Sequence, residues 1–136
     1  MLVDEDNPTH PIVTDARDVL FPFTSGALRG GTHRHEFSGD GQWIGFTYND
    51  AVMADKGKKY NLRTIGVTKL NHPVSISGEN DRGNFSGAGT SALVVRVTSV
   101  PGPGSDEISH AADDSCLLYT SPSPRDLSTS RMPSSA

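Results

Sequence analysis

The sequence predicts an all-β fold, and three observations lead to this prediction. Fourteen glycines and nine prolines in 136 residues provide frequent turn positions. Aromatic and β-branched residues occur in short runs between them, as is typical of β-strands. No apolar pattern with the 3.6-residue spacing of a helix continues for more than two turns.

The clearest predicted element is a hairpin near the middle of the chain. The segment Ser38-Gly-Asp-Gly41 has the Asp-Gly chemistry of a tight turn and joins strands expected over 32–37 and 42–48. In the second strand, Ile44 and Phe46 share one face and Trp43 lies on the other. Because both faces carry apolar residues, we expect this strand to be covered on both sides.

The elements around this hairpin are less regular. A short apolar run over 19–23 and a Gly-rich turn over 25–31 precede the hairpin. A third strand is expected over 61–70 and a fourth over 91–100, with a Gly/Ser/Asn-rich loop between them. Pro101 begins the turn that ends the fourth strand, and a short helix is expected over 108–114.

The C-terminal segment differs from the rest. From Ser121 to Ala136, nine of sixteen residues are Ser or Pro, which predicts disorder. Residues 116–126 resemble a translated transposon-end sequencing adaptor, and 130–136 resemble the matching flow-cell adaptor. We therefore predict that residues 116–136 are an adaptor-derived, non-native tail, the alternative being a genuine Ser/Pro-rich tail.

Charge and cysteine content exclude several classes of function. The net charge of −4 disfavours a nucleic-acid partner, because phosphate binding requires an excess of Lys and Arg. No apolar run is long enough to span a membrane. The single cysteine, Cys116, belongs to the predicted tail, so thiolate catalysis is not expected in residues 1–115. Localisation stays open between the periplasm and the cytoplasm of a bacterium.

The hairpin segment also carries a family resemblance. Phe37-Ser-Gly-Asp-Gly-Gln-Trp-Ile-Gly-Phe-Thr-Tyr-Asn-Asp50 resembles the repeated blade signature of TolB-like β-propellers, although Gly39 stands where that signature usually has Pro and only one clear copy is present. Four segments of the chain, in this order, resemble an uncharacterised bacterial branch of that family, the YidR-like proteins: 26–33, 46–50, 52–53 and 103–108.

The resemblance implies a partial β-propeller over residues 19–115, with about two to three blades of an incomplete ring. Residues 1–18 would then be a loop or the ragged end of a preceding blade. Open blades expose sheet edges, so the fragment is expected to fold poorly or aggregate on its own.

Residues 32–36 are the part of the chain richest in chemically active side chains. On a regular strand, His33 and His35 project from one face, where both can bind one transition-metal ion, and Glu36 faces away. Packing or hydrogen bonding is the commoner role for such a pair. Arg29 and Arg34 are candidates for holding a ligand carboxylate, with surface or inter-blade ion pairs as the alternative.

A second resemblance gives this segment a specific chemistry. His35-Glu-Phe37 resembles part of the manganese-binding strand of oligogalacturonate lyases, which are also propellers. This implies His33 and His35 as ligands of a manganese-like divalent ion. Asn49 and Asp50 provide oxygen atoms suited to calcium, but capping of a turn is the favoured role for them.

Two functional hypotheses follow. The favoured one is a scaffold that binds a protein, small-molecule or carbohydrate ligand without turnover. The alternative is a metal-dependent enzyme of the oligogalacturonate-lyase type that acts on acidic sugars. No cofactor other than such a metal ion is indicated by the sequence.

Overall fold

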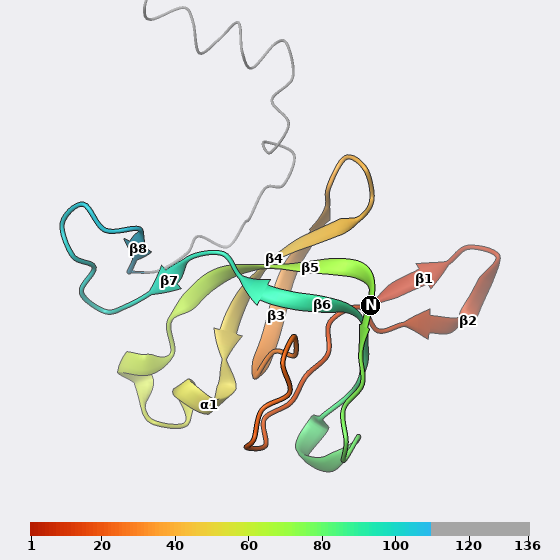
Figure 1. Ribbon diagram of the computed structural model, residues 1–136, viewed down its shortest axis with the longest axis horizontal. Coiled ribbons are helices and arrows are strands. Elements are labelled where there is room, and N and C mark those ends of the chain that lie inside the picture. The colour runs from red at the N-terminus through yellow and green to blue at the C-terminus, as the bar shows by residue number, and fades with distance from the viewer. Residues whose placement is uncertain (110–136) are drawn as a thin grey trace, which may run out of the picture.

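The computed structural model describes residues 1–109 and confirms the all-β prediction (Figure 1). Its elements are β1 Leu2–Asp4, β2 Asn7–Ile12, β3 Gly30–Phe37, β4 Trp43–Asp50, α1 Ala51–Ala54, the 3-10 helix η1 Lys58–Tyr60, β5 Arg63–Val74, the 3-10 helix η2 Asp81–Gly83, β6 Gly87–Leu93, β7 Arg96–Val97 and β8 Glu107–Ile108. The predicted non-native tail, 116–136, lies outside the described residues.

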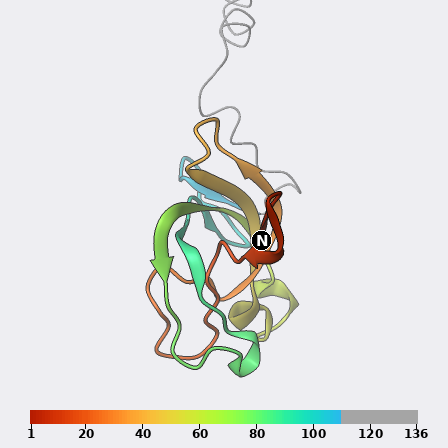
Figure 2. The same ribbon diagram turned by 90° about the vertical axis from the view of Figure 1, so that its right-hand side faces the viewer.

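The centre of the fold is a four-stranded antiparallel sheet in the order β3-β4-β5-β6. Neighbouring strands in the sheet are also consecutive in the chain, so the sheet is a meander. Tyr48 of β4 pairs with Thr32 of β3 and with Thr64 of β5. Figure 2 shows β5 curving strongly along the sheet. Two further sheets, β1-β2 and β7-β8, have two strands each.

Both faces of β4 are covered, as predicted. Ile44, Phe46, Thr47 and Tyr48 are all buried, and Phe46 and Thr47 have no exposed surface. Because consecutive residues of a strand point to opposite faces, burial of Phe46 together with Thr47 requires cover on both sides. On one side Phe46 and Tyr48 pack with Leu28 in a core cluster.

The segment 13–18 covers the outer edge of β6 and part of the sheet. The amide N–H groups of Ala88 and Gly89 donate to the carbonyl oxygens of Val13 and Thr14, each at 2.8 Å. A second apolar cluster, formed by Ala16, Val74 and Ile76, lies in this region. The edge of β6 is therefore satisfied by the chain itself.

Residues 1–18 were expected to be a loop or the ragged end of a preceding blade, and the first part of this segment departs from the loop alternative. Residues 2–12 form the β1-β2 hairpin, in which Leu2 pairs with Ile12 and the Asp4 carboxylate accepts the Asp6 N–H at 3.0 Å. All six residues of β2 are exposed. A strand with no buried face has no alternation of apolar and polar residues, so its backbone pairing was not visible in the sequence.

The third and fourth predicted strands had shifted boundaries. β5 continues to Val74, past the predicted end at residue 70, with a register irregularity between Leu70 and Val74. β6 begins at Gly87 and ends at Leu93, whereas the prediction was 91–100. The residues 87–90 were interpreted as loop because of their glycines. In the structure, a Cβ on Gly87 would lie only 2.3 Å from the Ala16 nitrogen, so glycine permits close packing there.

The last described strands also differ from expectation. β7 and β8 pair in parallel, with Arg96 opposite Glu107 and Val97 opposite Ile108. Ile108, the expected first residue of a short helix, is therefore in a strand. Ser109 is not helical either, and residues 110–114 of that predicted helix lie outside the described residues.

Asp18 holds the loop that leads into β3. Its carboxylate accepts hydrogen bonds from the backbone and hydroxyl of Thr24, from the Leu20 N–H and from the Asn84 side chain. Burial by itself would raise the pKa of Asp18, but these hydrogen bonds, led by that of the Thr24 hydroxyl, outweigh it and hold the pKa below its usual value. The loop is thereby fixed ahead of Arg29.

None of the helices found between residues 1 and 109 has the length and apolar character needed to cross a membrane.

Candidate functional site

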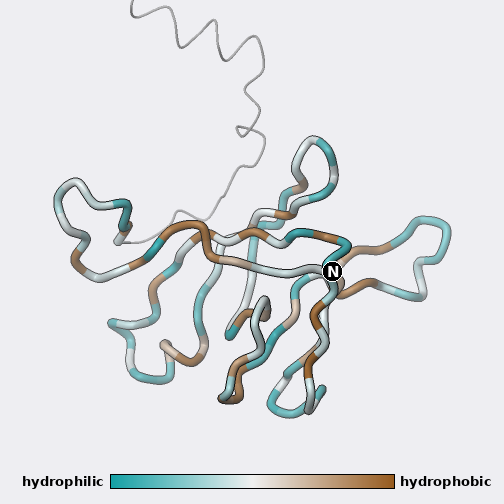
Figure 3. The backbone as a smooth tube through the Cα atoms, viewed as in Figure 1, coloured by the Kyte–Doolittle hydropathy of each residue, from teal (hydrophilic) through white to brown (hydrophobic). Residues whose placement is uncertain are grey.

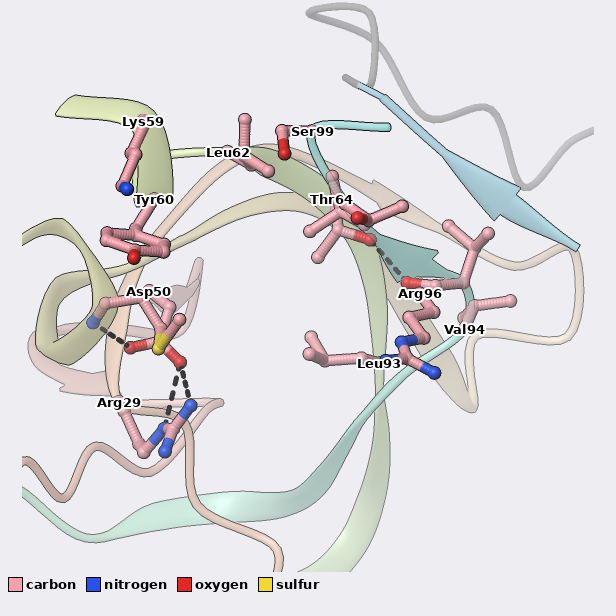
Figure 4. Close-up of a pocket in the computed structure, with 14 residues that line it drawn as sticks. Arg29, Asp50, Lys59, Tyr60, Leu62, Thr64, Leu93, Val94, Arg96 and Ser99 are labelled. Carbon is pink, nitrogen blue, oxygen red and sulfur yellow. Dashed lines mark hydrogen bonds and ion pairs between the residues drawn. The ribbon is translucent and has the colours of Figure 1, made fainter. Parts of the chain in front are cut away.

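A cavity of about 560 Å³ opens at the end of the sheet where β4 ends, β5 begins and β6 ends (Figure 4). Its volume falls within the range that holds small-molecule ligands in proteins. It is lined by Arg29, Asp50, Met53, Lys59, Tyr60, Leu62, Thr64, Leu93, Val94, Val95, Arg96, Val97, Thr98 and Ser99.

An ion pair between Arg29 and Asp50 forms one wall. The Arg29 Nε lies 2.9 Å from Asp50 Oδ2, and Nη2 also contacts this oxygen. The other carboxylate oxygen accepts the Met53 N–H at 3.0 Å and so caps helix α1. Both oxygens of Asp50 are therefore engaged, which confirms the predicted capping role of this residue.

Tyr48 supports this ion pair from the core. Its hydroxyl accepts the Arg29 backbone N–H at 3.0 Å, and the Arg29 carbonyl accepts the Ala51 N–H at 3.0 Å. Burial, together with the negative charge of Asp50, raises the pKa of Tyr48 to about 12. The guanidinium of Arg29 also lies over the Phe23 ring, 4.9 Å from its centroid. Arg29 is thus fixed through its backbone and its side chain.

The opposite wall is mainly apolar. Leu93 and Val94 are 50% and 62% exposed, which is high for aliphatic residues, and Figure 3 shows a continuous hydrophobic stretch where β6 leads into β7. Thr64 secures this wall to β5 because its hydroxyl donates to the Val95 carbonyl at 2.6 Å. Figure 4 places the two walls facing each other across the cavity.

A smaller cavity of about 290 Å³ borders the same ion pair. Arg29, Asp50 and Leu93 line both cavities. Phe23, Leu28 and Tyr48 line only the smaller one. The Arg29–Asp50 pair is therefore shared by the two cavities, and the smaller one also borders the core residues Leu28 and Tyr48.

The two arginines predicted to hold a carboxylate do not line the same cavity. Arg29 lines both cavities, and its ion pair with Asp50 matches the ion-pair alternative. Arg34 lines neither and has a positive φ of 54° within β3. The sequence reasoning treated β3 as a regular strand, and this left-handed residue is where that assumption fails.

A bulge at Arg34 changes the geometry of the histidine pair. The pairing jumps from His33 opposite Thr47 to Glu36 opposite Gly45, so two residues of β3 face one residue of β4. His33 and Glu36 consequently share the Thr47 face. The expectation that Glu36 faces away from His33 was wrong, because the bulge adds one residue to the alternation.

His35 lies on the other face. Its ring centroid is 6.1 Å from that of Phe46, and its Nε2 lies 2.9 Å from the Thr32 hydroxyl. Burial lowers the pKa of His35, Asp15 opposes this effect, and positive charge at the N-terminus and at His33 adds to it. The premise that both imidazoles share one face is therefore wrong.

The manganese-like ion implied by the lyase resemblance fits these residues poorly. Across residues 1–109, no three His, Cys, Asp or Glu side chains gather into a group that could hold a metal ion. A pair of ligands on opposite faces of a sheet does not form such a centre either. Metal binding by His33 and His35 stays a prediction.

The residues that sequence reasoning missed are Lys59, Tyr60 and Arg96. They come from η1 and from the start of β7, far apart in the chain, and meet only at the cavity. Lys56, Lys58 and Lys59 do form a short basic stretch in the sequence, but a charge run of this kind is usually a solvated surface. No spacing pattern distinguished Lys59 from its neighbours.

Fold and site together define an all-β protein with a ligand-sized cavity at one end of an antiparallel meander. The chain belongs to the family described as "Protein of unknown function (DUF3748)", whose family model matches residues 1–84.

It is similar to "Uncharacterized protein YidR" of Escherichia coli (strain K12), with 42% identity over 100 residues. The match covers 74% of this chain and 24% of that protein, so the chain spans about a quarter of the length of this curated relative. These findings confirm the predicted YidR-like relationship. No solved structure gives a significant match.

Proposed function

We propose that this chain is a section of a β-propeller that binds a small ligand without converting it. The cavity between the Arg29–Asp50 pair and the Leu93–Ser99 wall is the observation that carries this proposal. Asp50 is the only carboxylate that residues 1–109 contribute to its lining, and hydrogen bonds from Arg29 and the Met53 N–H occupy both of its oxygens. Such a carboxylate is poorly suited to act as a general base.

The topology of the central sheet supports the propeller part of the proposal. A propeller blade is a four-stranded antiparallel sheet, and β3-β4-β5-β6 has this order. In Figure 1, the β1-β2 hairpin and the β7-β8 pair lie at opposite sides of this sheet, where strands of neighbouring blades would begin. Small-angle scattering of a full-length family member tests this, since a closed ring gives a compact disc and a linear array gives an elongated particle.

Ligand binding is tested by nuclear magnetic resonance on the isotope-labelled chain. A mixture of small acids, amines and neutral compounds is added, and backbone amide shifts are followed. The proposal predicts saturable shifts that concentrate at residues 29, 50, 59–64 and 93–99, with every compound recovered chemically unchanged. Shifts scattered over the whole sheet, or conversion of a compound that depends on the protein, contradict the proposal.

The enzymatic alternative receives no comparable support. A lyase on acidic sugars needs a metal ion or a base beside the substrate, and His33 and His35 are not among the residues that line the cavity. No specific observation therefore favours it over binding.

A further inference from the structure

The charges at the larger cavity are unbalanced. From the described part of the chain, three cationic side chains line it, Arg29, Lys59 and Arg96, against the single carboxylate of Asp50. Arg29 is neutralised by Asp50, and Arg96 lies 3.4 Å from Glu107. Within residues 1–109, Lys59 forms no ion pair, and its ammonium group lies 4.9 Å from the centroid of the Tyr60 ring. Lys59 is therefore the uncompensated positive charge at the rim.

The rest of the lining favours hydrocarbon. Leu62, Leu93, Val94 and Val97 present aliphatic side chains to the cavity, and Met53 adds a thioether. Asp50 and Thr64 already use their polar atoms, the former with Arg29 and Met53 and the latter with the Val95 carbonyl. The hydroxyl groups of Tyr60, Thr98 and Ser99 also line the cavity, but most of its lining is apolar, so an apolar group gains from leaving water there.

We infer that the cavity binds an amphipathic anion, whose acid group pairs with the Lys59 ammonium and whose hydrocarbon body lies against Leu93 and Val94. Figure 4 shows Lys59 and Tyr60 on one side of the opening and Leu93 projecting from the other, so the charged and the apolar contacts lie on opposite sides of the same cavity. This inference rests on the proposed binding function and specifies the chemistry of the ligand.

The head group is tested with matched probes on the full chain. We expect octanoate to bind at the cavity, and octanol and octylammonium to bind at least about tenfold more weakly, because they lack the negative charge that Lys59 attracts.

Lys59→Met should weaken octanoate binding about tenfold, the effect of losing one charge-assisted contact. Lys58→Met is the control, because Lys58 does not line the cavity. Equal weakening in both variants would indicate unspecific attraction and overturn the inference.

The hydrocarbon contact is tested separately. Leu93→Ser should weaken octanoate binding several-fold, whereas Val100→Ser should leave it unchanged, because Val100 is 80% exposed and lies outside the cavity. Each variant is compared with the wild-type chain by its amide spectrum, and Lys59→Arg should retain binding. Octylammonium binding as tightly as octanoate would overturn the inference.

Galacturonate separates this inference from the proposed function. Saturable binding of galacturonate at the cavity without binding of octanoate overturns the amphipathic-anion assignment and leaves a ligand-binding site in place. If neither probe nor any compound of the mixture shifts the residues of the cavity, both the inference and the proposed function fail.

Discussion

The two ends of the β3-β4 hairpin are built in different ways. At the turn end, Ser38 donates to Asp40 at 2.6 Å, and the N–H groups of Gln42 and Trp43 donate to Asp40 and Ser38 at 3.0 Å. All these partners lie within five residues of each other. At the cavity end, Arg29 pairs with Asp50 across 21 positions, and Thr64 pairs with Val95 across 31.

Because of this difference, the turn end depends on local contacts, whereas the cavity end depends on the tertiary fold. The turn end is exposed, and its hydrogen bonds form within one short segment, so they require little of the remaining fold. The cavity end depends on four segments that arrive from distant parts of the chain. Changes at the cavity end should therefore affect the whole domain, while equivalent changes at the turn end should have small effects.

The largest effect is expected from a pair of glycine substitutions. A Cβ on Gly30 would lie 1.9 Å from the Asn49 carbonyl oxygen, whereas nothing lies within 4 Å of a Cβ on Gly39. Gly30→Ala should lower the free energy of unfolding by more than about 3 kcal/mol. Gly39→Ala should change it little. Chemical denaturation of both variants checks this, and equal stability of the two would show that β3 and β4 separate easily at the cavity end.

Two aspartates give the next comparison. Asp50→Ala leaves the Arg29 guanidinium without its partner and removes the cap of α1, so we expect a loss of about 2 kcal/mol in the free energy of unfolding. Asp40→Ala removes only exposed turn contacts and should cost clearly less. Thermal unfolding of the two variants measures this order. A larger loss for Asp40→Ala would place the critical contacts at the turn.

A pH titration sharpens the same comparison. The Tyr48 pKa is raised from 10.0 to about 12, so the folded state holds the phenolic proton more tightly than the unfolded state does. The contribution of this tightly held proton to the free energy of unfolding is fully present below pH 10. It is lost as pH rises toward about 12, where the free energy of unfolding has decreased by about 2 kcal/mol. Tyr48→Phe should remove this pH dependence. An unchanged profile in Tyr48→Phe would assign the loss to another group.

The smallest effect on stability is expected at the bulge. His33→Ala/His35→Ala alters mainly exposed side chains of β3, so the fold should be retained. The metal proposal predicts that Mn²⁺ broadens the signals of both imidazoles at stoichiometric concentration, and that the double variant no longer takes up stoichiometric Mn²⁺. Broadening of only one ring, or none, contradicts shared coordination of one ion. His72→Ala is a control outside β3.

The predictions from sequence were accurate where the determining contacts are local. The Asp-Gly turn, the strand that follows it and the coverage of both faces of β4 were visible in consecutive residues. The β1-β2 hairpin was missed because β2 has no buried face. The first part of β6 was missed because its glycines also fit a loop, and only their tertiary contacts explain them: Gly87 lies against Asp15 and Ala16, and Gly89 against Thr68 and Lys69.

The candidate site shows the same division. Sequence identified Arg29 as a binding candidate because an arginine can hold a carboxylate, and Asp50 as a cap because it follows the second predicted strand. It missed the bulge at Arg34, because a non-glycine residue with positive φ gives no pattern, and this separated His33 from His35. It also could not select Lys59 from three similar lysines.

The sequence by itself determined the all-β class, the hairpin and the relationship to the YidR-like proteins, because these depend on residue types at short spacing. Only the tertiary structure decided which side chains meet at the cavity and which face each histidine occupies. The physical reason is that a strand's alternation is set locally, whereas its register, its bulges and the elements that cover it depend on segments distant in the chain.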